Sequence, residues 1–123
     1  MAQKILVVDD SSIVRTQCRL VLQQAGYEVV EAWDASQALA ALRKTEVAFM
    51  LCDLNIPGMN GLDLVEALHD EPQFASLRTA IMTSEASAEL VARAKRVGVS
   101  SWLTKPCKAD ALLMVIAKFV GSP

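Results

Sequence analysis

The sequence has 123 residues, of which 53% are hydrophobic and 21% are charged, and its formal net charge is -2 at pH 7. This length suffices for one hydrophobic core, so we expect a single domain over residues 1–123, and the composition excludes a disordered chain. The negative charge argues against direct nucleic-acid binding, and no apolar stretch approaches the roughly 18 residues that a membrane span needs.

Apolar runs alternate with helical patterns from the start of the chain. KILVV (4–8) is short, continuous and β-branched, which predicts a strand covered on both faces. The segment 10–26 carries apolar residues at helical spacing and ends in a glycine, a typical helix stop. YEVVEA (27–32) predicts a second, less uniformly apolar strand, and DASQALAALRK (34–44) predicts a helix.

The same alternation continues to the end of the chain. AFMLC (48–52) and TAIMT (79–83) predict two more buried strands, with a helix, LDLVEALHD (62–70), between them. The segment LNIPGMNG has one proline and two glycines in eight residues, which is typical of a turn. The remaining elements are a helix over 87–98, a short strand, SWLT (101–104), and an amphipathic helix over 108–120.

Five strands that alternate with five helices over short connections predict an α/β fold, an open parallel sheet with helices on both faces. The first, third and fourth strands are the most uniformly apolar and belong in the middle of the sheet. The second and fifth strands are mixed and belong at its edges. We therefore predict a flavodoxin-like five-stranded sheet in the order 2-1-3-4-5.

Ligands of such sheets bind at the carboxyl ends of the strands. Asp9 and Asp10 follow the first strand, Asp53 follows the third, Thr83 ends the fourth, and Lys105 follows the fifth. Mg²⁺ prefers oxygen ligands such as these carboxylates, and a carboxylate can attack phosphorus to form an aspartyl phosphate. The sequence therefore predicts a phosphoryl-transfer site with Mg²⁺ as cofactor, in which Lys105 and Thr83 contact phosphoryl oxygens.

Four motifs in this order carry a resemblance to a known family. They are VVDDSS, LCDLNIPGMNG, MTSE and LTKP, each at the end of a predicted strand. Over residues 1 to about 120, the chain resembles the receiver domain of two-component response regulators, in its single-domain, chemotaxis-regulator-like form. The resemblance implies a phosphorylation-activated signalling switch that catalyses only its own phosphorylation and dephosphorylation, and is not a turnover enzyme.

The resemblance also implies roles for the acidic residues and their neighbours. Asp53 is the expected phosphoacceptor, and its donor is a sensor histidine kinase or a phosphotransfer protein. The expected Mg²⁺ ligands are Asp9, Asp10 and Asp53, together with the main-chain carbonyl of Asn55. Within the acidic pair, Asp10 is expected to be the direct ligand. Asn55 and Glu85 are expected to flank the attacking water and to tune the lifetime of the phosphoryl group.

Further roles concern the switch and the partner surface. Lys105 is the expected invariant ammonium, and its peptide bond to Pro106 is expected to be cis. Thr83 and Trp102 are the expected switch pair, although the family usually has Tyr or Phe at the second position. The alternative is that Trp102 only fills the surface of the edge strand. A downstream protein is expected to bind the helix–strand–helix face within residues 87–120.

Three alternative functions share parts of this pattern. A flavin-binding electron carrier has the same fold but needs a Gly/Ser/Thr-rich phosphate loop where this chain has DDSS. A phosphatase of the haloacid dehalogenase type has its nucleophile in a DxD motif after the first strand and a cap domain, and the sequence has neither. A degenerate receiver, acting as a phosphorylation-independent interaction module, stays open as the alternative function.

The remaining polar residues suggest structural roles. Cys18, Cys52 and Cys107 fit no CxxC or zinc pattern, which indicates a reducing compartment. The first residues carry one lysine before an apolar run ended by acids, unlike a secretion signal. We therefore expect a cytoplasmic protein without membrane contacts. His69 is predicted to be a solvated residue at a helix end, and Arg93 to lie on a solvated helix face.

Overall fold

The computed structural model describes residues 2–85 and 87–121, so both ends of the predicted 1–123 domain lie outside the described residues. Within these residues five parallel strands form one sheet in the order β2-β1-β3-β6-β7. They are β1 (Lys4–Val8), β2 (Glu28–Ala32), β3 (Phe49–Asp53), β6 (Arg78–Thr83) and β7 (Ser101–Thr104). Counted along the chain, this order is 2-1-3-4-5, so the predicted flavodoxin-like sheet is confirmed.

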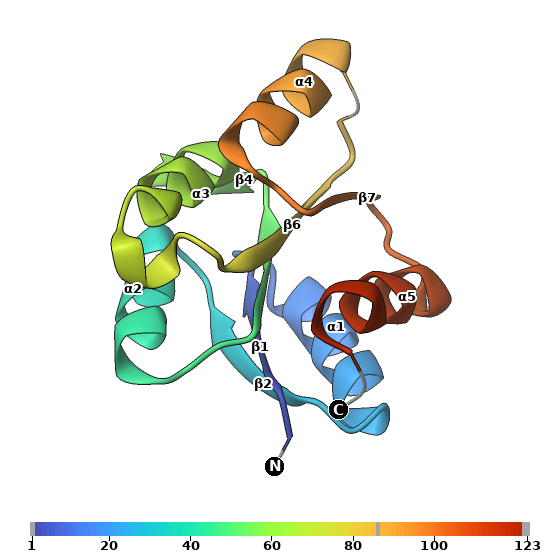
Figure 1. Cartoon of the computed structure of the whole chain (residues 1–123). Coiled ribbons are helices and arrows are strands. Elements are labelled where there is room, and N and C mark those ends of the chain that lie inside the picture. The colour runs from blue at the N-terminus through green and yellow to red at the C-terminus, as the bar shows by residue number, and fades with distance from the viewer. Residues whose placement is uncertain (1, 86, 122–123) are drawn as a thin grey trace.

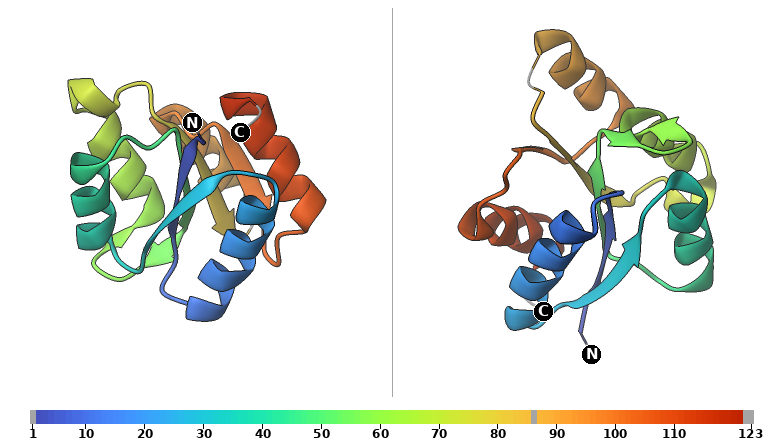
Figure 2. Two further views of the ribbon diagram at one scale, coloured as in Figure 1. Left: turned by 90° about the horizontal axis from the view of Figure 1, so that it is seen from below. Right: turned by 180° about the vertical axis from the view of Figure 1, so that it is seen from behind.

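Helices cover both faces of the sheet (Figure 1). In the described chain they are α1 (Ser12–Gln24), α2 (Ala35–Lys44), α3 (Gly61–His69), α4 (Ala88–Val97) and α5 (Ala109–Val120), with a 3₁₀ helix, η1 (Pro72–Phe74), before β6. Figure 2 shows α1 and α5 together on one side of the sheet and α2 and α3 on the other. Among the described helices, none has the combined length and apolar character needed to cross a membrane.

Short polar side chains fix where the helices begin. Ser11, Asp34 and Ser87 precede α1, α2 and α4, and each side chain accepts a hydrogen bond from the backbone N–H three residues further on. These contacts satisfy N–H groups that have no partner within the helix. Gly98 ends α4 in the left-handed conformation with a φ of 89°. Because Ser11 follows the acidic pair directly, its cap places the start of α1 beside the predicted site.

Two apolar clusters, one on each face of the sheet, form the core. Ile5 and Val7 belong to the cluster beneath α1 and α5, whereas Leu6 and Val8 belong to the cluster beneath α2, α3 and α4. Successive side chains of a strand point to opposite faces, so a central strand must be apolar at every position. This requirement explains the continuous apolar run of the first strand.

The predicted turn after β3 holds more regular structure than the sequence indicated. β4 (Asn55–Ile56) and β5 (Met59–Asn60) form a small antiparallel hairpin, and α3 begins at Gly61. A Cβ atom at Gly61 would lie 2.5 Å from the backbone oxygen of Asp53. Only glycine therefore lets the start of α3 approach the end of β3 this closely.

Candidate functional site

The predicted site residues converge at the carboxyl edge of the sheet. Asp53 is in register with Met82, and Thr83 with Thr104, so the ends of β3, β6 and β7 are neighbours. Asp9 extends β1 by one residue, since its backbone N–H donates to the carbonyl of Ala32 over 3.0 Å. The parallel sheet thus gathers residues that lie far apart along the chain.

The ammonium of Lys105 lies between two buried carboxylates. Its Nζ is 2.7 Å from Oδ2 of Asp9 and 3.2 Å from Oδ2 of Asp53. Asp9 is fully buried and Asp53 is 8% exposed. Two buried carboxylates this close repel each other, and a buried charge requires a partner of opposite sign. Lys105 supplies that partner to both.

The electrostatics of this group shift two pKa values. Burial, and next the charge of Asp9, raises the pKa of Asp53, against the opposing effects of Lys105 and the backbone N–H of Asn55. Burial by itself lowers the pKa of Lys105, but its hydrogen bonds to Asp9 and Asp53 outweigh burial and leave that pKa raised. The site therefore holds a firmly protonated ammonium beside a carboxylate whose negative charge is disfavoured.

Asp9, Asp10 and Asp53 form a cluster that suits a divalent cation. Each offers a carboxylate oxygen, and the three oxygens lie within 4.8 Å of one another. Both oxygens of Asp9 are engaged, one by the backbone N–H of Ser11 at 2.9 Å and one by Lys105. Asp10 is exposed, and its carboxylate makes no hydrogen bond or ion pair within residues 2–85 and 87–121. A spare carboxylate beside two carboxylates that share one ammonium leaves the cluster negative, which fits Mg²⁺, a cation that prefers oxygen ligands and retains water.

Thr83 lies at the site's edge but on the other face of the sheet. It is 2% exposed, and its Oγ1 accepts a hydrogen bond from the backbone N–H of Glu85 over 3.0 Å. By strand alternation it points to the same face as Ile81, whereas Asp53 points to the face of Met82. In the described part of the chain, no hydrogen bond joins the Thr83 hydroxyl to Asp53.

Trp102 is part of the core on the α4 side. It pairs with Ile81 across the sheet and packs, half-buried, against the apolar cluster that includes Ala94 of α4. Its Nε1 is buried and has no hydrogen-bond partner among the described residues. The indole is thus partly buried on this side of the sheet, and its N–H is an unpaired donor.

The structure also describes the Lys105–Pro106 bond, the two residues expected to flank the attacking water, and the cysteines. The Lys105–Pro106 bond is cis, as predicted. Glu85 and Asn55 are both exposed beside the site. The three cysteines are free.

His69 and Arg93 make contacts that their sequence positions do not reveal. The Nδ1 atom of His69 lies 2.8 Å from the carbonyl oxygen of Val97, and its Nε2 atom 3.0 Å from that of Leu77. The prediction of a solvated histidine is therefore wrong. Arg93 pairs with Asp63 and thereby ties α4 to α3. The contacts of His69 with Val97 and of Arg93 with Asp63 span 28 and 30 residues, and that of His69 with Leu77 leaves its helix for the loop before β6, so helical spacing gave no signal for them.

The sequence also gave Arg15 no role, although it contacts the acidic segment. Its guanidinium donates to the backbone carbonyl of Asp9 over 2.7 Å. The sequence feature that could have indicated this contact is the position of Arg15 near the start of α1, because the Ser11 cap fixes that start next to the acidic pair. A side chain one turn into such a helix lies close to the end of β1.

Comparisons with known proteins agree with this geometry. A family model for the response regulator receiver domain matches residues 5–117. The chemotaxis protein CheY of Pseudomonas aeruginosa is 34% identical over 116 residues, which are 94% of each chain. The solved structure of the chemotaxis protein CheY4 of Vibrio cholerae has a TM-score of 0.91 and 34% identity, and the match covers 97% of this chain and 99% of that one. The CAI-1 autoinducer sensor kinase/phosphatase CqsS of Vibrio cholerae is 30% identical over 119 residues, but this chain spans only 17% of its length.

Proposed function

Because the chain belongs to the response regulator receiver domain family, we propose that it is a two-component signalling switch phosphorylated on Asp53. The observation that carries the proposal is the position of Lys105, whose ammonium reaches both Asp9 and Asp53 in a cluster of three carboxylates. An ammonium and a spare acidic ligand beside a carboxylate are the groups that phosphoryl transfer to that carboxylate requires.

The reaction begins from the ionised carboxylate of Asp53. One of its oxygens forms a bond to phosphorus while the bond from phosphorus to the donor breaks. The donor is a phosphorylated histidine of a sensor kinase or phosphotransfer protein, and the leaving imidazole nitrogen takes up a proton. Lys105 already lies against Asp53 and offers its N–H groups to the transferred oxygens.

Asp9, Asp10 and Asp53 would hold the metal ion, with the main-chain carbonyl of Asn55 as a further ligand. Mg²⁺ bound there would neutralise negative charge on the phosphoryl oxygens. Asp10 would contribute most directly because its carboxylate is the one that no ammonium or backbone N–H engages among the described residues. The acidic pair is thus divided between one anchored carboxylate and one available carboxylate.

The response starts at Thr83. Its oxygen accepts from the backbone N–H of Glu85, and its own hydroxyl proton has no acceptor among the described residues, so that proton can be donated to a phosphoryl oxygen on Asp53. Movement of Thr83 changes the space beside Trp102 and shifts the population of arrangements of α4, β7 and α5, the proposed partner surface. Water then hydrolyses the aspartyl phosphate between Asn55 and Glu85, and the switch resets.

The test is the mass of the intact protein after incubation with acetyl phosphate, with and without Mg²⁺. We expect wild type to gain one phosphoryl group only with Mg²⁺, and Asp53→Asn to gain none. A phosphoryl group on Asp53→Asn would refute the assignment of Asp53. No gain by wild type in either condition would favour the alternative of a phosphorylation-independent interaction module.

A further inference from the structure

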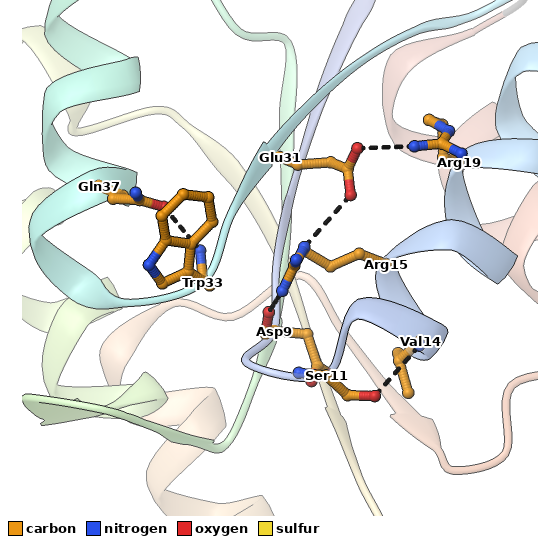
Figure 3. Close-up of polar contacts among 8 residues, drawn as sticks. All are labelled: Asp9, Ser11, Val14, Arg15, Arg19, Glu31, Trp33 and Gln37. Carbon is orange, nitrogen blue, oxygen red and sulfur yellow. Dashed lines mark hydrogen bonds and ion pairs between the residues drawn. The ribbon is translucent and has the colours of Figure 1, made fainter.

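Arg15 contacts Asp9, Glu31 and Trp33, which lie in three different segments beside the site (Figure 3). Its Nη1 donates to the backbone carbonyl of Asp9 over 2.7 Å, and its Nε donates to Oε1 of Glu31 over 3.2 Å. Its guanidinium carbon also lies 5.6 Å from the centre of the Trp33 ring. The side chain is 14% exposed, so these contacts fix a largely buried guanidinium between α1, β2 and the loop after β2.

The contact with Asp9 also restrains the position of Asp10. A peptide unit is planar, so the carbonyl of Asp9 and the nitrogen and Cα of Asp10 lie in one plane. Arg15 restrains this peptide unit through the carbonyl oxygen of Asp9. The backbone N–H of Asp9 donates to the carbonyl of Ala32 and so restrains Asp9 itself at the edge of the sheet. The Asp10 carboxylate makes no hydrogen bond or ion pair of its own among the described residues, so the direction of its Cα–Cβ bond sets the region that it can reach.

We propose that Arg15 is a positioning residue that aims the Asp10 carboxylate at the metal site by holding the Asp9 carbonyl. The proposal deepens the proposed function, since it concerns the same metal site, but its primary readout is metal affinity without any phosphoryl donor. Side chains that orient metal ligands typically change metal affinity about 10-fold or more when removed.

Electrostatic repulsion alone predicts the opposite change in Mg²⁺ affinity when Arg15 is removed. A positive guanidinium near a cation site repels the cation, so its removal should strengthen Mg²⁺ binding. Loss of a positioning contact should weaken it. The sign of the change therefore separates the two effects.

Arg19 provides a matched control. It lies one turn further along α1 and donates to the other oxygen of the same Glu31 over 3.0 Å. Its side chain is 35% exposed, and no hydrogen bond or ion pair joins it to Asp9 among the described residues. A variant at Arg19 removes the same charge and the same kind of ion pair but leaves the Asp9 carbonyl held.

The experiment is a Mg²⁺ titration of wild type, Arg15→Gln, Arg15→Lys and Arg19→Gln, followed through the backbone N–H resonance of Ser11 by NMR. We expect Arg15→Gln to weaken Mg²⁺ binding about 10-fold, and Arg19→Gln to change it by less than about twofold. Arg15→Lys keeps the charge but loses the planar fork, so it should weaken binding as well, and this variant decides the question if Arg15→Gln fails to fold.

Unchanged or stronger Mg²⁺ binding by the Arg15 variants would overturn the inference, as would an equal loss in Arg19→Gln. Failure of the proposed function is a separate result. If wild type binds Mg²⁺ but never gains a phosphoryl group, the phosphorylation proposal fails while the role of Arg15 in metal binding is still decided by the titration.

Discussion

On the α1 and α5 side of the sheet, the buried carboxylates of Asp9 and Asp53 share the ammonium of Lys105, whereas on the α4 side the buried indole N–H of Trp102 has no acceptor within the described residues. The two regions lie at the same edge of one sheet, and β3 and β6 connect them. In the first, one ammonium is held between two carboxylates before any ligand binds, and the acidic cluster keeps a net negative charge. In the second, a polar group is left unsatisfied.

This difference suits two different tasks. Phosphoryl transfer needs charges held in place in advance, because reorganising them during the reaction would raise the barrier. A response to phosphorylation needs an arrangement that a small free energy can change. A buried unpaired donor costs about 1–3 kcal/mol, so it brings alternative arrangements of Trp102 closer in free energy to the present one. We therefore assign chemistry to the first region and response to the second.

Among residues other than the phosphoacceptor, removal of the free carboxylate of Asp10 should slow phosphorylation most. Asp10→Ala should reduce the rate of phosphorylation by acetyl phosphate on the order of 100-fold, because the proposed Mg²⁺ site loses its most available carboxylate. The residual rate should no longer depend on Mg²⁺. A rate that stays Mg²⁺-dependent and near that of wild type would place the metal ligands elsewhere.

Lys105→Ala should affect both regions. It leaves two buried carboxylates without their cation, and we expect the free energy of unfolding to fall by about 2 kcal/mol at pH 7. Because the pKa of Lys105 is raised above 10.5, this contribution is complete below pH 10.5 and is lost as pH rises through the raised value. Phosphorylation should survive in part, without the response at Trp102.

Urea unfolding of wild type and Lys105→Ala at several pH values measures this difference. Lys95→Ala is the matched control, since Lys95 is exposed on α4. Equal loss of stability in both variants, or a normal response of Trp102 in phosphorylated Lys105→Ala, would contradict the role given to Lys105.

Asp53→Asn should lose function and gain stability. Burial and the charge of Asp9 raise the pKa of Asp53 above 3.8, so its ionisation disfavours the folded state. This penalty grows as pH rises above 3.8 and is complete above the raised pKa. In the absence of Mg²⁺, Asp53→Asn should therefore unfold at a Tm a few degrees above that of wild type at pH 7, a gain of about 1 kcal/mol. The gain should shrink towards pH 3.8, and a variant less stable than wild type at pH 7 would refute this account of Asp53.

Trp102→Phe should have the smallest effect on stability. Phenylalanine is smaller than tryptophan, which costs packing, but it also removes the unpaired N–H. The two effects oppose each other, so we expect a change in the free energy of unfolding below about 1 kcal/mol. A loss above about 3 kcal/mol, typical of a well-satisfied buried aromatic, would show that the indole N–H has a partner after all.

The features that the sequence predicted correctly depend on local pattern and on the geometry of parallel sheets. Continuous apolar runs marked β1, β3 and β6 as central strands, and the carboxyl ends of those strands gave Asp9, Asp10 and Asp53 as one cluster. Both follow from residues read in order along the chain. The resemblance supplied the cis bond before Pro106, which no pattern in the sequence would have indicated.

The features that the sequence did not reveal are contacts between distant segments. His69 lies within hydrogen-bond distance of carbonyls in α4 and in the loop before β6, and Arg15 contacts Asp9 while pairing with Glu31 of β2. The unpaired N–H of Trp102 depends on which atoms surround it in the packed core. Such contacts are fixed by tertiary packing, and spacing within one helix or strand does not encode them.

The most direct test of this division between chemistry and response follows the indole N–H resonance of Trp102 by NMR, with Trp102→Phe for its assignment. The spectrum is recorded before and after phosphorylation by acetyl phosphate and Mg²⁺, with the phosphoryl gain checked by mass, for wild type and Asp53→Asn. We predict that the resonance shifts in phosphorylated wild type and stays in place in Asp53→Asn. A phosphorylated wild type whose Trp102 resonance does not move would contradict the account.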